Sequence, residues 1–217
     1  MKRLTLGFVF CLAAILSFAQ THPAHTAVKS SADQIWSNLE AGNQRFATGH
    51  SSQPNYVAQR QATDKSQSPK VAVLACADSR VSPELLFDKG IGDLFVVRNA
   101  GNSPDPIAIG SMEYAVEHLG TTVIVVLGHQ SCGAVAAACS GEKMPTVNLD
   151  AVVAPITASC SVAKGGNLTP AIKDHVHQSA QELVSHSPVL KHEVEEGKVT
   201  VIEAYYELDT GKVIRLN

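Results

Sequence analysis

Short runs of apolar residues alternate with a helix-like segment through the middle of the chain. Val71–Ala75, Leu94–Val97 and Thr122–Leu127 are almost wholly apolar, as expected for strands that are covered on both faces. Pro106–Leu119 has the spacing of an amphipathic helix and lies between the last two of these runs. This alternation predicts an α/β fold with a mostly parallel central sheet flanked by helices.

Further elements are predicted on both sides of this core. An amino-terminal helix is expected over Ala32–Thr48, with Ser30 or Ser31 as its N-cap, and the polar stretch Ser51–Pro69 is expected to be a loop. Three helical patterns follow Cys132: one that runs through Ala138, then Asn148–Ala163 and Pro170–Ser187. Lys198–Tyr206 and Lys212–Leu216 are expected to be strands of a carboxyl-terminal hairpin that turns at Asp209-Thr210-Gly211.

The first residues have the pattern of a secretory signal. Lys2 and Arg3 precede the apolar run Leu4–Phe18, and Ser17 and Ala19 place small residues at the −3 and −1 positions of a cleavage site. An uncleaved membrane anchor is the alternative, but the run is short of the roughly 20 residues that a span requires. We therefore expect a signal peptide over residues 1–19, a flexible lead-in over 20–31 and a single domain over 32–217. The expected compartment is outside the cytoplasm, with the periplasm favoured and no membrane attachment after cleavage.

Composition narrows the class of protein. The chain has 217 residues, of which 45% are hydrophobic, and a formal net charge of −3, so it can bury a core and is not expected to be disordered. Seventeen basic residues against 20 acidic ones, without a basic tract, give no electrostatic support for nucleic-acid binding. Five cysteines are too few for a disulfide-knit miniprotein.

Candidate metal ligands follow two of the predicted strands. Cys76 comes directly after Val71–Ala75, and His129 and Cys132 follow Thr122–Leu127. Because the carboxyl ends of parallel strands meet at one edge of a sheet, these three side chains are expected to converge. Two thiolates and an imidazole suit tetrahedral Zn²⁺ with one open position, as in a catalytic site. Spacing alone leaves zinc binding and purely structural cysteines equally open.

Asp78 and Arg80 lie two and four residues beyond Cys76. The guanidinium can fork onto both carboxylate oxygens, which would keep Asp78 ionised and fix its direction beside a metal-bound water. A weak surface ion pair is the alternative. A cysteine phosphatase is disfavoured because Asp78 would repel phosphate, and a thioredoxin-like site is disfavoured because no Cys-x-x-Cys is present.

Together these residues resemble the β-class carbonic anhydrases, whose signature is Cys-x-Asp-x-Arg followed about fifty residues later by His-x-x-Cys. The resemblance runs from Ala32 to the end and includes four further segments: Gly42-Asn43-Gln44-Arg45-Phe46, Val96–Asn102, Glu113-Tyr114-Ala115, and Ala204-Tyr205-Tyr206 with Asp209-Thr210-Gly211. It implies one Zn²⁺ per chain on Cys76, His129 and Cys132, with Asp78 and Arg80 as the orienting dyad. The implied reaction is reversible hydration of carbon dioxide to bicarbonate and a proton by a hydroxide on zinc.

The resemblance also implies a plant-type substrate pocket. Gln67 would donate a hydrogen bond to substrate, and Phe95 and Tyr114 would form apolar walls. Gly133 is also expected to be a substrate-binding residue. Ala100 stands where plant-type members carry a larger branched residue, so a slightly wider pocket is expected. The family builds its site at a dimer interface, which implies that Phe95 comes from a partner subunit and that the protein is a homodimer or a higher even-numbered homo-oligomer.

Two details of the implied mechanism remain open. The Gln67 motif favours an always-open site over one in which bicarbonate drives Asp78 onto the metal. His118, at the end of its predicted helix, is a candidate proton relay, although a histidine there is more often a solvated cap. Two other functions also stay open: a zinc hydrolase of carbon disulfide or carbonyl sulfide on the same fold, and a non-catalytic zinc-binding protein.

The chain has an odd number of cysteines, but an even number would remain after cleavage of the signal peptide. Cys11 would leave with the signal, and Cys76 and Cys132 are the proposed zinc ligands. Cys139 and Cys160 remain, on neighbouring predicted helices. They are expected to form a disulfide or to be two separately buried thiols.

Overall fold

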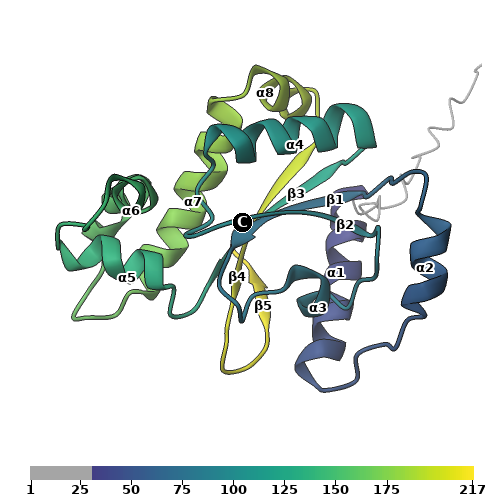
Figure 1. Cartoon of the computed structure of the whole chain (residues 1–217), viewed down its shortest axis with the longest axis horizontal. Coiled ribbons are helices and arrows are strands. Elements are labelled where there is room, and N and C mark those ends of the chain that lie inside the picture. Colours follow the sequence, from purple (N-terminus) through teal and green to yellow (C-terminus); the bar gives the residue numbers. More distant parts are fainter. Residues whose placement is uncertain (1–30) are drawn as a thin grey trace, which may run out of the picture.

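The computed structural model describes residues 31–217 and contains a five-stranded sheet (Figure 1). The strands lie in the order β2-β1-β3-β4-β5; β1 to β4 are parallel to their neighbours, and β5 is antiparallel to β4. Their bounds are β1 Val71–Cys76, β2 Leu94–Asn99, β3 Val123–His129, β4 Thr200–Tyr206 and β5 Val213–Arg215. The predicted α/β fold, with its mostly parallel sheet, is confirmed. The predicted signal peptide, and all of the lead-in before Ser31, lie outside the described residues.

Helices cover both faces of the sheet because alternate residues of the buried strands point to opposite sides. On one face, Val73 and Val125 pack with Trp36 of α1. On the other, Leu74 and Val126 pack with residues of α4, α7 and α8. The helices are α1 Ser31–Ala47, α2 Tyr56–Ala62, α3 Pro83–Leu86, α4 Pro106–Leu119, α5 Gly133–Ser140, α6 Val147–Val153, α7 Thr169–Ser185 and α8 Pro188–Glu195, with a 3-10 helix η1 over Ala154–Val162.

Three stretches differ from the sequence prediction, in addition to the short helix α3, which was not predicted. The polar stretch Ser51–Pro69 was expected to be a loop but contains α2, which Asn55 caps by accepting a hydrogen bond from the Ala58 N–H. The single helix expected over Asn148–Ala163 is two elements, α6 and η1, which meet just before Pro155. Pro155 has no backbone N–H to continue the α-helical hydrogen bonds, which accounts for the change at that point. The third is α8, which follows Ser187.

Asn43 of α1 connects the beginning of the described chain to its end. Its buried side-chain amide donates to the carbonyls of Leu86 and Gly211, and its carbonyl accepts from the Val213 N–H. One side chain therefore ties α1 to the residue at the end of α3 and to the β4–β5 hairpin.

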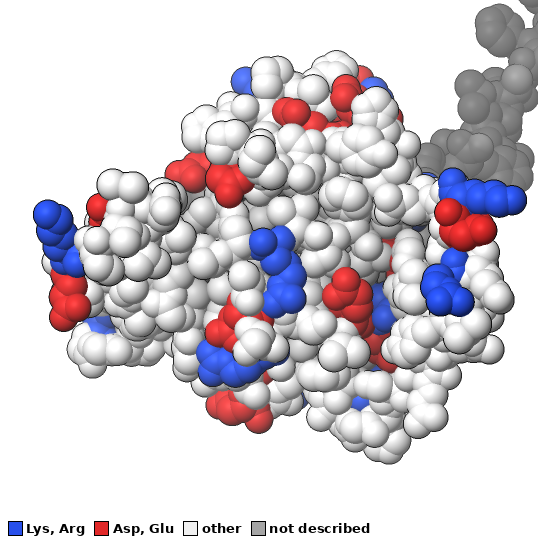
Figure 2. Space-filling view, in the orientation of Figure 1, with Lys and Arg blue, Asp and Glu red and all other residues white. Residues whose placement is uncertain are grey.

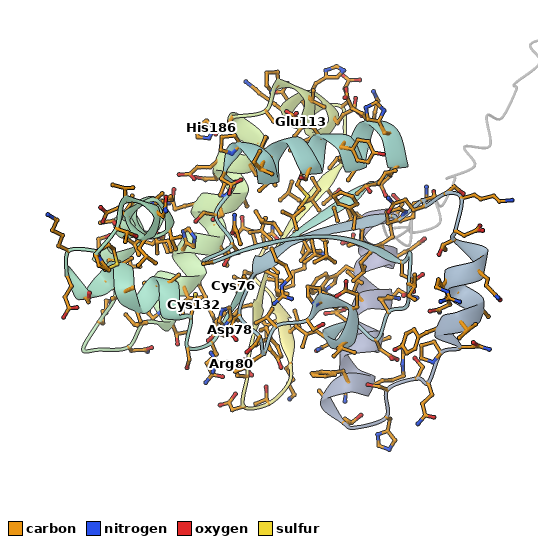
Figure 3. The ribbon with its side chains drawn as sticks, in the orientation of Figure 1. Cys76, Asp78, Arg80, Glu113, Cys132 and His186 are labelled. Carbon is orange, nitrogen blue, oxygen red and sulfur yellow. A yellow bond between two sulfur atoms is a disulfide. The ribbon has the colours of Figure 1, made fainter. Side chains whose placement is uncertain are left out.

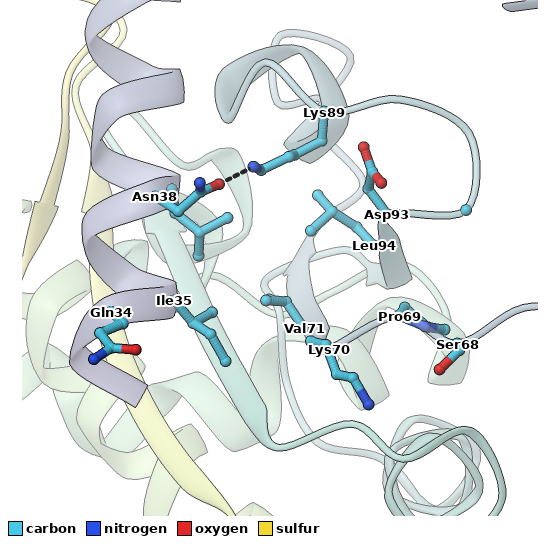
Figure 4. A pocket seen from close by; sticks show the side chains of 12 residues that line it. Gln34, Ile35, Asn38, Ser68, Pro69, Lys70, Val71, Lys89, Asp93 and Leu94 are labelled. Atoms are coloured by element: carbon cyan, nitrogen blue, oxygen red, sulfur yellow. Dashed lines mark hydrogen bonds between the residues drawn. The ribbon is translucent and has the colours of Figure 1, made fainter. Parts of the chain in front are cut away.

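Two surface features complete the fold. Lys and Arg side chains are interspersed with Asp and Glu over the face in Figure 2. A cavity of about 420 Å³ lies between α1 and the amino ends of β1 and β2, where Lys89 donates a hydrogen bond to Asn38 (Figure 4).

Within residues 31–217, no helix has the length and apolar character needed to cross a bilayer.

Candidate metal centre

Cys76, His129 and Cys132 meet at the carboxyl end of the parallel sheet (Figure 3 labels the two cysteines). Cys76 is the last residue of β1, His129 is the last residue of β3, and Cys132 precedes the first residue of α5. All three are buried, and their candidate ligand atoms lie within 4.8 Å of one another. The adjacent parallel strands β1 and β3 end side by side, so residues 53 positions apart are brought into one cluster.

The His129 ring is oriented as a metal ligand. Its Nδ1 lies 2.9 Å from the Gln130 carbonyl oxygen, which can only accept, so Nδ1 carries the proton. Nε2 then has a free lone pair, and it is buried without a hydrogen-bond partner among the described residues. The Nε2 lone pair and the two cysteine sulfurs form a donor set that suits Zn²⁺. The Gln130 carbonyl fixes the ring, as a second-layer contact does for a histidine ligand of a metal.

Gln130 is itself held by the β4–β5 hairpin. Its backbone N–H donates to the Tyr206 carbonyl over 2.8 Å, and its side-chain oxygen accepts from the Leu208 N–H over 2.8 Å. The hairpin therefore fixes the carbonyl that orients His129.

The two thiols are coupled. A side-chain hydrogen bond from Cys132 lowers the pKa of the Cys76 thiol, and the same contact raises the pKa of Cys132. The backbone N–H groups of Ala134 and Val135, at the start of α5, act in the opposite direction and lower the pKa of Cys132. A divalent cation would bind both sulfurs as thiolates and displace the protons that they carry.

Asp78 and Arg80 form a two-pronged ion pair beside the three ligands (Figure 3). Arg80 donates from Nε to Asp78 Oδ1 over 2.9 Å and from its terminal nitrogen to Oδ2 over 2.7 Å. This guanidinium holds the pKa of the Asp78 carboxyl well below its usual range, so the carboxylate is ionised at neutral pH. Asp78 Oδ2 lies 4.0 Å from His129 Nε2, which places the negative oxygen next to the metal ligands.

Two supporting residues were not predicted from the sequence. Arg98 of β2 donates to the carbonyls of Cys76 and Asp78 over 3.0 and 2.7 Å, and so fixes the backbone between ligand and dyad. Gly101 donates its backbone N–H to Cys76 Sγ over 3.4 Å. The charge of Arg98 directly after the apolar run Leu94–Val97 was the available signal; nothing in the sequence pattern marks the Gly101 contact.

The predicted substrate-binding residues are separated in the single chain. Gly133 is exposed at the start of α5, directly after Cys132. Phe95 instead pairs with Ala72 near the amino end of β1, four residues and roughly 13 Å along the sheet from the end where Cys76 lies. Tyr114 contacts the Phe95 ring at 6.3 Å between centroids, and Gln67 precedes β1 at that same amino end.

The candidate proton relay, His118, also lies with this second group. Its ring centroid is 5.1 Å from that of Tyr114. The single chain therefore brings together the metal ligands, the dyad and Gly133, but not Gln67, Phe95, Tyr114 or His118.

Cys139 and Cys160 are joined by a disulfide, the first of the two arrangements left open by the sequence. The bond links α5 to η1, whose Ile156 packs in the same apolar cluster as Cys76 and Cys132. The helix that follows the third ligand is thus covalently attached to the segment that covers it.

Comparisons with known proteins place the chain in a family. The sequence model of the family described as carbonic anhydrase matches residues 71–213. "Carbonic anhydrase 2" of Mycobacterium tuberculosis (strain CDC 1551 / Oshkosh) is 36% identical over 186 residues, which covers 82% of this chain and 90% of that protein.

Solved structures share the fold. The β-carbonic anhydrase CcaA has a TM-score of 0.65 and 26% identity, covering 85% of this chain and 88% of its own. A second match is one of two tetrameric β-carbonic anhydrases from the ascomycete Sordaria macrospora, with a TM-score of 0.66 at 20% identity, covering 85% of this chain and 98% of its own. At that identity the second match supports the fold alone.

Proposed function

The chain belongs to the β-class carbonic anhydrases, and we propose that it is a zinc enzyme that interconverts carbon dioxide and water with bicarbonate and a proton at the Cys76–His129–Cys132 centre. The observation that carries this proposal is the buried His129 Nε2, whose lone pair is unpaired among the described residues and faces two cysteine sulfurs. Bound there, Zn²⁺ would supply a nucleophile at neutral pH by lowering the pKa of water.

Asp78 orients the reacting water in this proposal. Both of its oxygens are held by Arg80, so the carboxylate keeps its charge and direction and accepts a hydrogen bond at the edge of the centre. Because Arg80 holds both carboxylate oxygens, Asp78 would not act as a fourth ligand to the metal. This supports an always-open site.

A second copy of the chain would complete the substrate pocket. Gln67, Phe95 and Tyr114 lie at the end of the sheet remote from their own metal ligands, so only another subunit can bring such residues to the centre. Phe95 belongs to the edge strand β2, whose residues are only partly buried, and no residue of α2 is buried. These incompletely covered elements support a homodimer or a higher even-numbered homo-oligomer, with a plant-type pocket in which Gln67 donates to substrate and Phe95 and Tyr114 exclude water.

Export to the periplasm is also part of the proposal. It rests on the signal pattern of residues 1–19 and is supported by the Cys139–Cys160 disulfide, since disulfides persist in oxidising compartments.

Metal content and stopped-flow hydration of carbon dioxide test the proposed function. The purified protein is expected to contain about one zinc per chain and to accelerate hydration well above buffer. Cys132→Ser removes a thiolate ligand, and we expect it to lose zinc and activity together. Ser131→Ala is the matched control, because Ser131 is adjacent to Cys132 but contributes only its backbone carbonyl to a contact with Arg80. Full activity of Cys132→Ser, or a wild-type protein without zinc, would contradict the proposal.

A further inference from the structure

The loop after β2 contains two successive residues with left-handed backbone, Gly101 at φ 85° and Asn102 at φ 49°. Glycine tolerates this conformation but is also free to leave it. A Cβ on Gly101 would lie 2.7 Å from Ile156 Cδ1, so the position has no room for a larger residue. Within the loop, the Asn102 N–H donates to the Asn99 carbonyl; the Gly101 N–H donates to Cys76 Sγ, and its direction also depends on what holds the Gly101 carbonyl from outside the loop.

His175 of α7 makes such a contact. Its side chain is buried, and Nε2 lies 2.7 Å from the Gly101 carbonyl oxygen. A carbonyl only accepts, so Nε2 carries the ring proton and donates it. The hydroxyls of Ser103 and Ser179 lie further away, 3.3 and 3.4 Å from the same nitrogen.

Packing alone does not account for a histidine at this position. Its other nitrogen, Nδ1, is buried and has no hydrogen-bond partner in the part of the chain that the structure describes. Burying an unpaired acceptor costs free energy that an apolar side chain would not cost. Burial also lowers the pKa of His175, so the ring is neutral and Nε2–H is its single donor at neutral pH.

We propose that His175 is a positioning residue of the metal centre: its Nε2–H holds the Gly101 carbonyl and so keeps the Gly101 N–H directed at Cys76 Sγ. A hydrogen bond to a thiolate takes up part of its negative charge, and second-layer contacts of this kind tune both the affinity and the donor strength of metal ligands. The inference rests on the proposed zinc binding by Cys76.

Zinc transfer from the loaded protein to a chromophoric chelator measures the effect. His175→Leu removes the donor, and we expect about 10- to 100-fold weaker zinc binding. His175→Gln places an amide N–H near the position of Nε2 and is expected to restore most of the affinity. Ser179→Ala is the matched control, since it removes one hydroxyl from the same ring but leaves the bond to Gly101.

Spectra of the Co²⁺-loaded proteins provide a readout besides affinity and activity. The sulfur-to-cobalt charge-transfer band reports on the thiolates, so it should shift in His175→Leu and return in His175→Gln. Should His175→Leu fail to fold, His175→Met, which is flexible and also lacks a donor, is expected to behave in the same way.

The outcomes separate this inference from the proposed function. A wild-type protein that takes up no zinc contradicts both. A zinc-loaded wild type whose affinity and cobalt spectrum are unchanged in the donor-free variant overturns the inference alone. Equal losses in His175→Leu and His175→Gln also overturn it, because they would show a packing role.

Discussion

The two ends of the sheet differ in how much of their chemistry a single chain completes. At the carboxyl end, Cys76, His129 and Cys132 are buried, and each has a hydrogen-bond partner in the same chain. At the amino end, Gln67 and Tyr114 are exposed, and Phe95 is only partly covered. Under the proposed function, metal binding would therefore be a property of the single folded chain, whereas the substrate pocket would be a property of the assembly.

The dyad offers the largest effect with which to test the carboxyl end. Asp78→Asn removes the negative acceptor while keeping the shape, so we expect hydration to slow by about 10²–10⁴-fold with zinc retained. Asp88→Asn is the matched control, because Asp88 forms a comparable pair with Arg45 away from the centre. The measurements are the stopped-flow hydration rate and the zinc content of both variants. An Asp78→Asn protein with wild-type activity would exclude the proposed role of Asp78 in orienting the reacting water.

Mixing two defective variants tests whether the two ends of the sheet act together across subunits. Gln67→Ala leaves the metal ligands intact but removes a donor to substrate, and we expect a loss of about 10²-fold. Cys132→Ser lacks the metal but keeps Gln67.

Mixed dimers should regain activity, because the metal centre of one copy then meets the intact Gln67 of the other. Random exchange of subunits predicts about a quarter of wild-type activity. The measurement is the hydration rate after mixing, dissociation and reassembly. No recovery, despite mixed dimers detected by mass spectrometry, would show that each chain uses its own Gln67.

The disulfide provides a smaller effect, on stability. Replacing both Cys139 and Cys160 by serine opens a link between positions 21 residues apart, and we expect the free energy of unfolding to fall by about 3 kcal/mol. Zinc content should remain, since the ligands keep their own contacts. Reductant should lower the melting temperature of the wild type and leave that of the double variant unchanged; the same shift in both would assign the effect to another group.

The smallest effect on stability is expected at Asp88, which forms a second Asp–Arg pair with Arg45. Burial raises the pKa of Asp88, but hydrogen bonds from Ser52 and Arg45 lower that pKa by more, so it lies below its ordinary value. We expect Asp88→Asn to lower the free energy of unfolding by about 1–3 kcal/mol without changing zinc content.

The pH dependence of that difference follows from the direction of the shift. A carboxyl with a depressed folded pKa contributes its full stability above the unfolded value of about 3.9, and loses it as the pH falls through the folded value. Denaturant titrations of wild type and Asp88→Asn should therefore differ equally from pH 7 to about pH 5, and converge in stronger acid. A difference that disappears already near pH 6 would assign it to another group.

The sequence predicts the carboxyl end of the sheet well. Cys76 and His129 follow apolar strands, and the convergence of parallel strand ends needs no knowledge of side-chain contacts. The support around them is less accessible: Gly101 and His175 meet through a loop and a helix that are 74 positions apart. Only the packing of α7 on the sheet brings them together.

Other features could not be predicted because the relevant physics is local or intermolecular. Ser51–Pro69 is mostly polar, and its larger apolar residues Tyr56 and Val57 are exposed, so α2 gives no apolar periodicity, although Asn55 is a suitable cap. Ser187 and Pro188 are an ordinary helix start, yet α8 was not predicted. Phe95 was expected to act across a subunit interface by resemblance, and spacing within one chain contains no information on that arrangement.

The side chain of Asn43 bears on the order in which parts of the structure form during folding. It binds Gly211 and Val213, which lie 168 and 170 positions further along the chain. The hairpin that contains them also fixes Gln130, and through it His129. Contacts between such distant positions form late in folding. The imidazole thus reaches its final direction only once the hairpin has packed against α1, so in the proposed function the metal would bind after these distant parts of the chain have met.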